Sequence, residues 1–176
     1  MAKNALITVI GPDRQGLIAD IAGRLFDLNV NLGDTTFAVL GEMAEFTCLA
    51  EIPEQIALAD VERELAGLGG MADMKITVTG LELAPVHAES GHITHRIEMK
   101  GSDRPGVVAR LSEVFGQFGA NIVRMNSEQV PGDERNLYVT RFAVWIPERR
   151  ADACLATLAN TAGELRMTFR SEVVDG

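Results

Sequence analysis

Two short turns carry the residues of this chain that are best suited to bind a small polar molecule. The first reads Asp-Arg-Gln-Gly-Leu at residues 13–17, and the second reads Asp-Arg-Pro-Gly-Val at residues 103–107. Each combines a carboxylate, a guanidinium and a glycine, and each precedes a run with the apolar spacing of a helix. Free N–H groups at the start of a helix attract anions such as a carboxylate, so both turns are candidate ligand sites.

Much of this turn also has a structural explanation. Asp13 and Asp103 could accept hydrogen bonds from the first helical N–H groups, and Pro105 suits the first turn of a helix. Gly16 and Gly106 are harder to explain, because glycine inside a helical turn costs about 0.5–1 kcal/mol relative to alanine. Either another backbone approaches closely or a ligand needs the bare N–H groups, and the physics favours neither alternative.

The other chemistry-bearing side chains form no such set. Cys48 and Cys154 lie one in each half with no second thiol close in sequence, which predicts buried, reduced cysteines. Among His87, His92 and His95, the last two are three apart in an expected strand and therefore point to opposite faces. The sequence has no nucleophile elbow, phosphate loop or Cys–His arrangement. We therefore expect no metal, no cofactor and no catalysis.

The two turns belong to a duplicated unit. An offset of 90 residues pairs Asp13 with Asp103, Arg14 with Arg104, Gly16 with Gly106 and Asn31 with Asn121, and it pairs the apolar Leu17, Ile21, Leu25, Leu28 and Leu32 with Val107, Leu111, Phe115, Phe118 and Ile122. Asn29 and Gly119 occupy matching positions and predict left-handed ends of the first helix in each copy. A second motif, Ile-Pro-Glu, recurs at an offset of 94, which predicts four extra residues in the loop 130–136. The last strands align at an offset of 91.

Each copy predicts the order strand, helix, strand, strand, helix, strand. In the first copy these elements span residues 5–10, 16–28, 31–40, 44–52, 54–68 and 74–83, and the second copy repeats them from residue 92. Such a unit folds as a four-stranded antiparallel sheet with two helices on one face, the ferredoxin-like α+β fold. We expect domains at 1–84 and 92–176, joined by a linker at 85–91.

With the DRQGL and DRPGV turns after a first strand, and with NVNL or GANI leading into the second, the chain resembles two tandem ACT domains. This arrangement is similar to the glycine cleavage system transcriptional repressor family. The resemblance implies ligand sites between ACT units, where the turn of one unit faces the second strand of a neighbour. The implied site residues are Asp13, Arg14, Gln15, Gly16, Leu17 and Asn31 in one site, and Asp103, Arg104, Pro105, Gly106, Val107 and Asn121 in the other. Gln15 departs from the proline expected there.

Composition limits the partners of the chain. Its 25 acidic and 16 basic residues give a net charge of −9, which repels nucleic acid and anionic membranes. The 5% of aromatic residues also argues against an RNA-binding sheet. The first 14 residues contain too short an apolar run for a signal peptide, so we expect a cytoplasmic protein.

These observations predict a non-enzymatic regulatory protein that senses an amino acid, plausibly glycine or serine. It would act through a partner protein such as a transcription factor, and its unpaired sheet edges favour a homodimer. One alternative is an interaction module of the same fold that binds no ligand. Another is a small acylphosphatase-like hydrolase, although fold alone does not confer that chemistry.

Overall fold

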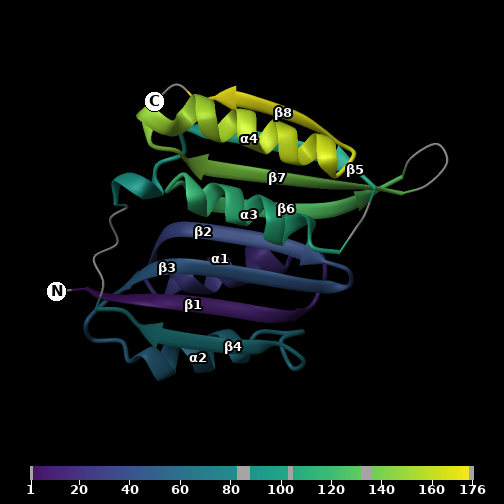
Figure 1. Cartoon of the computed structure of the whole chain (residues 1–176). Helices are drawn as coiled ribbons and strands as arrows, with labels where there is room; N and C mark the ends of the chain where they lie inside the picture. Colours follow the sequence, from purple (N-terminus) through teal and green to yellow (C-terminus); the bar gives the residue numbers. More distant parts are fainter. Residues whose placement is uncertain (1, 83–87, 103–104, 132–135, 175–176) are drawn as a thin grey trace. The chain divides into compact units, whose positions relative to one another are not determined.

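The computed structural model describes residues 2–82, 88–102, 105–131 and 136–174 of the chain (Figure 1). The chain divides into two compact units, Met1–Val86 and His87–Gly176. Each unit is built around its own hydrophobic core.

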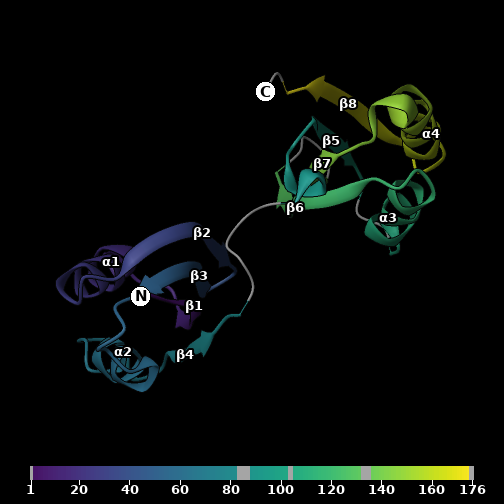
Figure 2. The same ribbon diagram turned by 90° about the vertical axis from the view of Figure 1, so that its left-hand side faces the viewer.

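Unit 1 follows the predicted order of elements. These are β1 (Lys3–Pro12), α1 (Leu17–Asp27), β2 (Asn31–Leu40), β3 (Met43–Ile52), α2 (Leu58–Ala66) and β4 (Lys75–Gly80). The strands form one antiparallel sheet in the order β2-β3-β1-β4. Both helices lie on the same face of that sheet (Figure 2). Alternate residues of β1, namely Ala5, Ile7 and Val9, are buried against them, as the two-residue period of a strand requires.

Unit 2 repeats this architecture. After a short 3₁₀ helix, η1 (Glu89–Gly91), come β5 (His95–Gly101), α3 (Val107–Gln117), β6 (Asn121–Val130), β7 (Leu137–Trp145), the 3₁₀ turn η2 (Glu148–Arg150), α4 (Ala151–Glu164) and β8 (Met167–Val173). The sheet order is β6-β7-β5-β8, again fully antiparallel. Phe115 of α3 and Phe142 of β7 meet in its core with ring centroids 5.2 Å apart. The duplicated ferredoxin-like fold is confirmed.

The ends of α1 and α3 match the sequence prediction. Asn29 and Gly119 both have left-handed backbones, with φ of 54° and 68°. The next residue in each copy donates its N–H back to the helix, from Val30 to Leu25 O and from Ala120 to Phe115 O, both at 2.9 Å. This is the Schellman arrangement, which satisfies carbonyl groups that the helix end leaves free.

Two of the element starts differ clearly from the sequence prediction, whereas the longer β6–β7 loop agrees with it. Helix α2 begins at Leu58 rather than at residue 54, because the chain first makes a turn in which Ile56 N–H donates to Pro53 O at 3.0 Å. Strand β5 begins at His95, so His92 is not in a strand. Element bounds do place four extra residues between β6 and β7, although most of that loop, residues 132–135, lies outside the described part of the chain.

The offset of 91 for the last strands is wrong. Ile10 pairs with Lys75 in unit 1, and Lys100, its equivalent in unit 2, pairs with Thr168. Lys75 and Thr168 are therefore equivalent positions, and the true offset is 93. A two-residue slip leaves every side chain on the same face of the sheet, so the alternation of residue types could not reveal it.

Candidate functional site

The turn that joins β1 to α1 is fixed by its glycine. Gly16 has φ of 80° and ψ of −1°, and Leu17 N–H approaches Arg14 O at 3.4 Å. These are the features of a type II turn, which needs a positive φ at its third residue and accepts proline at its second. The backbone dihedral therefore explains Gly16, and the two alternatives considered from sequence are not needed.

The turn glycine of unit 2 has the same backbone conformation. Gly106 has φ of 85° and ψ of 1°, and Pro105 occupies the second position that type II turns favour. Pro105 thus precedes the N-cap rather than occupying the first helical turn, as the sequence suggested. Asp103 and Arg104 lie outside the described residues.

The predicted capping role of Asp13 is wrong. The N-cap of α1 is Gly16, and no side chain caps the helix. Asp13 contributes its backbone instead, because its N–H donates to Glu42 O at 2.8 Å and ties the turn to the β2–β3 connection. Arg14 and Gln15, the first two residues of the type II turn, separate Asp13 from the N-cap.

The helix start keeps free donors. The first intrahelical bond runs from Asp20 N–H to Gly16 O at 3.0 Å, and within residues 2–82 the N–H groups of Ile18 and Ala19 have no partner. A Cβ built on Gly16 or Gly106 would meet no atom within 4 Å. Among the described residues, no other backbone therefore approaches either glycine closely. The arrangement leaves open space beside N–H groups at the positive end of a helix dipole, where a carboxylate is stabilised.

Arg14 has a structural task. Its Nη2 atom lies 2.7 Å from Asp20 Oδ2 of α1 and 3.1 Å from Gly69 O in the α2–β4 connection. The side chain therefore holds the turn against that connection, and its guanidinium is already occupied. Its Nε atom is buried without a hydrogen-bond partner in the described structure. Gln15, by contrast, is exposed beside the turn.

The apolar residues of the two turns belong to the cores. Leu17 and Val107 are each only 2% exposed and pack in the hydrophobic clusters of units 1 and 2. A ligand at either turn could reach their backbone atoms but not their side chains.

The two asparagines lie at the other end of each unit. Asn31 pairs with Glu51, whereas the turn follows Pro12, which pairs with Met43 at the opposite end of β3. The 11 residues of α1 correspond to about 16 Å. Asn31 donates from Nδ2 to Glu51 Oε2 at 3.2 Å, and Asn121 donates to Ser90 O of η1 at 2.8 Å. Within one unit the structure therefore does not bring turn and asparagine together.

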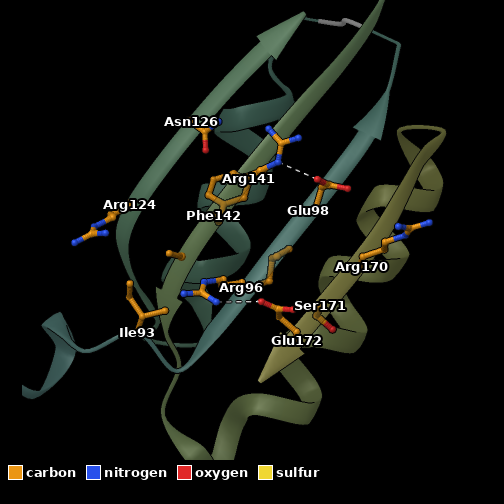
Figure 3. Close-up of a pocket in the computed structure, with 12 residues that line it drawn as sticks. Ile93, Arg96, Glu98, Arg124, Asn126, Arg141, Phe142, Arg170, Ser171 and Glu172 are labelled. Carbon is orange, nitrogen blue, oxygen red and sulfur yellow. Dashed lines mark hydrogen bonds and ion pairs between the residues drawn. The ribbon is translucent and has the colours of Figure 1, made fainter. Parts of the chain in front are cut away.

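A second candidate site was not predicted from the sequence. A hollow of about 590 Å³ lies on the face of the unit 2 sheet that the helices leave open. Arginines 96, 124, 141 and 170 line it, together with Glu98 and Glu172 (Figure 3). The signal was present as a charged residue at every second position, as in Arg96-Ile97-Glu98 and Arg170-Ser171-Glu172.

The cysteines and histidines provide no alternative centre. Burial raises the pKa of both Cys48 and Cys154 to about 11, so both thiols are protonated at neutral pH. Burial also lowers the pKa of His95, which lies 2.9 Å from Thr94 Oγ1 through its Nδ1 atom. The described residues contain no cluster of three metal-ligating side chains, and His87 lies outside them. None of the helices in that part of the chain is long and apolar enough to cross a membrane.

Comparison with known proteins decides the family. ACT-domain models match residues 3–79 and residues 95–144. The chain belongs to the ACT-domain family. Among curated relatives of this ACT-domain chain, a UPF0237 protein of Streptococcus mutans is 30% identical over 74 residues, 42% of this chain and 84% of the relative. A UPF0237 protein of Listeria monocytogenes is 30% identical over 80 residues, 45% and 90% of the two chains.

Solved structures match the whole length of this tandem ACT protein. An unknown protein from Galdieria sulphuraria has a TM-score of 0.79 at 20% identity and covers 99% of this chain, with all of its own length matched. A protein provisionally described as a glycine cleavage system transcriptional repressor has a TM-score of 0.71 at 13% identity, and the match covers 100% of this chain and 99% of that one. At these identities the likeness establishes the fold.

Proposed function

We propose that this tandem ACT protein is a non-enzymatic regulator that senses a small amino acid such as glycine or serine. It acts through a partner protein such as a transcription factor that controls amino-acid metabolism. Membership of the ACT family in both units supports a regulatory role. The solved structure that is provisionally described as a glycine cleavage system transcriptional repressor has the same tandem architecture, which supports a link between this protein and transcription.

The observation that carries the proposal is the uncapped start of α1 beside Gly16, repeated at α3 beside Gly106. The ligand carboxylate accepts hydrogen bonds from the N–H groups there, and the open space over each glycine admits it. Since Asn31 lies at the far end of its own unit, the asparagine that binds the ammonium and carboxylate groups comes from a neighbouring unit. The site is complete only between units.

A homodimer is the simplest assembly that brings such units together. Edge strand β2 exposes nearly all of its ten residues and has unpaired backbone groups along one side. Beside it α1 exposes Ile18 and Phe26, the latter to 79%. A second copy that paired with β2 by two-fold symmetry would cover both features.

We infer that the protein is cytoplasmic and does not bind promoter DNA by itself. Its charge is unevenly divided: residues 1–86 carry 13 acidic and 5 basic side chains, a net charge of −8, while residues 87–176 carry 12 and 11, a net charge of −1. The repulsive field therefore comes mainly from unit 1. Sequence-specific retention of promoter DNA by the pure protein in a gel-shift assay at physiological salt would contradict this part of the proposal.

A thermal-shift screen over the twenty amino acids, followed by calorimetry, tests the sensing function. Selective binding stabilises the folded state by mass action, by about 2.7 kcal/mol at a ligand concentration of 100 times Kd. Ile18→Pro and Val108→Pro each remove one free N–H from a first helical turn, where proline is tolerated, and should weaken binding. Gln15→Pro, which gives unit 1 the turn sequence of unit 2, is the folded control.

An interaction module without a ligand is the second candidate. This function is favoured by the contacts that Arg14 and Asn31 make within unit 1, because their hydrogen-bond donors are already used and are not free for a ligand. If none of the twenty amino acids shifts the melting temperature and the protein still dimerises, this second function replaces the first.

A further inference from the structure

We propose that the open face of the unit 2 sheet binds a small multivalent anion, either a phosphate ester or a polycarboxylate, above Ala143. This face is opposite to the helices and is separate from the two glycine turns. The inference therefore stands whether or not the turns bind an amino acid.

The site is a hollow with a small residue at its floor. Ala143 of β7 pairs with Arg124 of β6 on one side and with Arg96 of β5 on the other. Arg141 lies two residues earlier on β7 and therefore points to the same face. The side chains of Arg96, Arg124 and Arg141 thus line the hollow around this small residue. In Figure 3 Arg124 lies at the β6 edge with its guanidinium turned away from β7. The volume of about 590 Å³ falls within the range of about 300–1,000 Å³ that is typical of small-ligand pockets.

The charges in this hollow favour an anion. Its carboxylates are already engaged: Arg96 Nη1 lies 3.3 Å from Glu172 Oε1, and Arg141 Nε lies 2.9 Å from Glu98 Oε2. Arg141 also bonds Glu128 through Nη1, and this hydrogen bond raises the pKa of the arginine.

Two other arginines supply the excess positive charge. Arg124 and Arg170 have no carboxylate partner within the described ranges. The four arginines of the hollow therefore exceed the three glutamates that pair with them, Glu98, Glu128 and Glu172, by one charge. Arg124 is exposed at the β6 edge and can turn toward Ala143 without breaking an ion pair seen there. Planar guanidinium groups bind phosphate and carboxylate with paired hydrogen bonds.

Unit 1 shows that the fold does not require this charged surface. Where unit 2 pairs Arg96 with Ala143, unit 1 pairs Leu6 with Leu49. The adjacent row across the unit 1 sheet consists of four threonines, and the same row in unit 2 is charged or amide-bearing. The rows are Thr36, Thr47, Thr8 and Thr77 in unit 1, and Asn126, Arg141, Glu98 and Arg170 in unit 2. The arginines and the small floor residue are therefore features of unit 2 alone.

A compact anion fits this site better than a nucleic acid. Single-stranded nucleic acids are held by stacking on exposed aromatic rings. The only aromatic side chain that lines the hollow is Phe142, which is 1% exposed and packs in the core on the helix side. Replacement of leucine by alanine at the floor creates a local depression, whereas a nucleic acid strand needs an extended track.

Calorimetry on the full chain tests the proposal with pyrophosphate and citrate as probes, at constant ionic strength adjusted with sodium chloride. We expect one of them to bind at one site per chain, and the tighter probe identifies the class as phosphate or polycarboxylate. Arg124→Gln should weaken binding about tenfold, the loss expected when about 1.5 kcal/mol of charge-assisted hydrogen bonding is removed. Arg124→Lys should recover part of this affinity.

Ala143→Leu should abolish binding, because it fills the floor with the residue that unit 1 already has at Leu49. The matched control is Arg110→Gln, which removes an exposed arginine of α3 that is paired with Glu164 at 3.0 Å. It should leave the affinity unchanged. The proposal is overturned if neither probe binds, if Arg110→Gln weakens binding as much as Arg124→Gln, or if a single-stranded RNA displaces the probe.

Discussion

Replacement of the turn glycines by alanine should destabilise each unit by an amount set by the backbone alone. Gly16 and Gly106 have φ of 80° and 85°, a region in which an L-residue costs about 1–2 kcal/mol. A Cβ at either position meets nothing within 4 Å, so no steric clash adds to this cost. We therefore expect Gly16→Ala and Gly106→Ala each to lower the free energy of unfolding of their unit by about 1–2 kcal/mol. Asparagine, which tolerates this conformation, should cost less.

Gly23 provides a matched control of opposite sign. It lies inside α1, has a negative φ, and a Cβ there also meets nothing within 4 Å. Gly23→Ala should therefore stabilise unit 1 by about 0.5–1 kcal/mol, because alanine loses less backbone entropy in a helix. Gly16→Ala and Gly23→Ala differ by only seven positions in sequence and yet should move stability in opposite directions.

Urea unfolding followed by circular dichroism measures these effects, with near-ultraviolet spectra as a check on the native state. For a unit of fewer than 100 residues, 1 kcal/mol corresponds to a shift of about 4–8 °C in melting temperature. If Gly16→Ala were as stable as the wild type, the dihedral would not be the reason for the glycine. If Gly106→Asn lost amino-acid binding while it kept wild-type stability, the open space over the glycine would be the functional feature.

Three further predictions concern other groups. Cys48 and Cys154, each with a pKa near 11, should react with a thiol reagent at pH 8 only after unfolding, and rapid labelling of the native protein would contradict their burial. The pKa of His95 is lowered in the folded state, so unit 2 should lose stability as the pH falls below the unfolded pKa of about 6.5. His95→Gln should flatten this pH dependence of stability, and an unchanged pH profile in that variant would show that His95 does not cause it. Phe26→Glu should shift a dimer toward monomer in light scattering, whereas Val173→Glu, at a comparably exposed apolar position of unit 2, should not; a monomer at all concentrations of the wild type would exclude the dimer.

The fold was accessible from sequence because several local signals agreed. The repeat register, the apolar spacing of α1 and α3 and the left-handed caps at Asn29 and Gly119 all point to the same unit, and the structure contains each of them. The register of β8 was not accessible, because a two-residue slip preserves the alternation of faces. The β5–β8 pairing that fixes this register, like β1–β4 in unit 1, is a long-range property of the sheet.

The candidate site was less accessible because the sequence motif mixes two functions. Asp-Arg-x-Gly reads as a helix cap, but Gly16 is itself the N-cap and serves a type II turn, and Arg14 reaches across to Gly69 O. Neither the turn type nor the contact of Arg14 with Gly69 can be inferred from the spacing of residues in the sequence. The arginine surface was missed for another reason, because net charge averages over the chain. The charge of −9 concealed a unit of −1 in which four arginines line one face of a sheet.

The two copies of one fold have therefore diverged on different surfaces. At positions equivalent to Phe26, Phe37 and Val39, unit 2 has Gly116, Ser127 and Gln129. Among the described residues, six of the eight exposed large apolar side chains therefore belong to unit 1. On the open face of the sheet, unit 2 rather than unit 1 has the unusual surface, because unit 1 has the threonine row and unit 2 has the arginines. Neither difference touches the buried cores, which keep the same alternation in both copies. If only the stability of the fold constrained the two units, their exposed residues would differ to a similar extent on every face. In this protein, exposed apolar residues are concentrated on α1 and β2 of unit 1, and arginines are concentrated on the open sheet face of unit 2. We expect this distribution if unit 1 forms the dimer interface and unit 2 binds an anion.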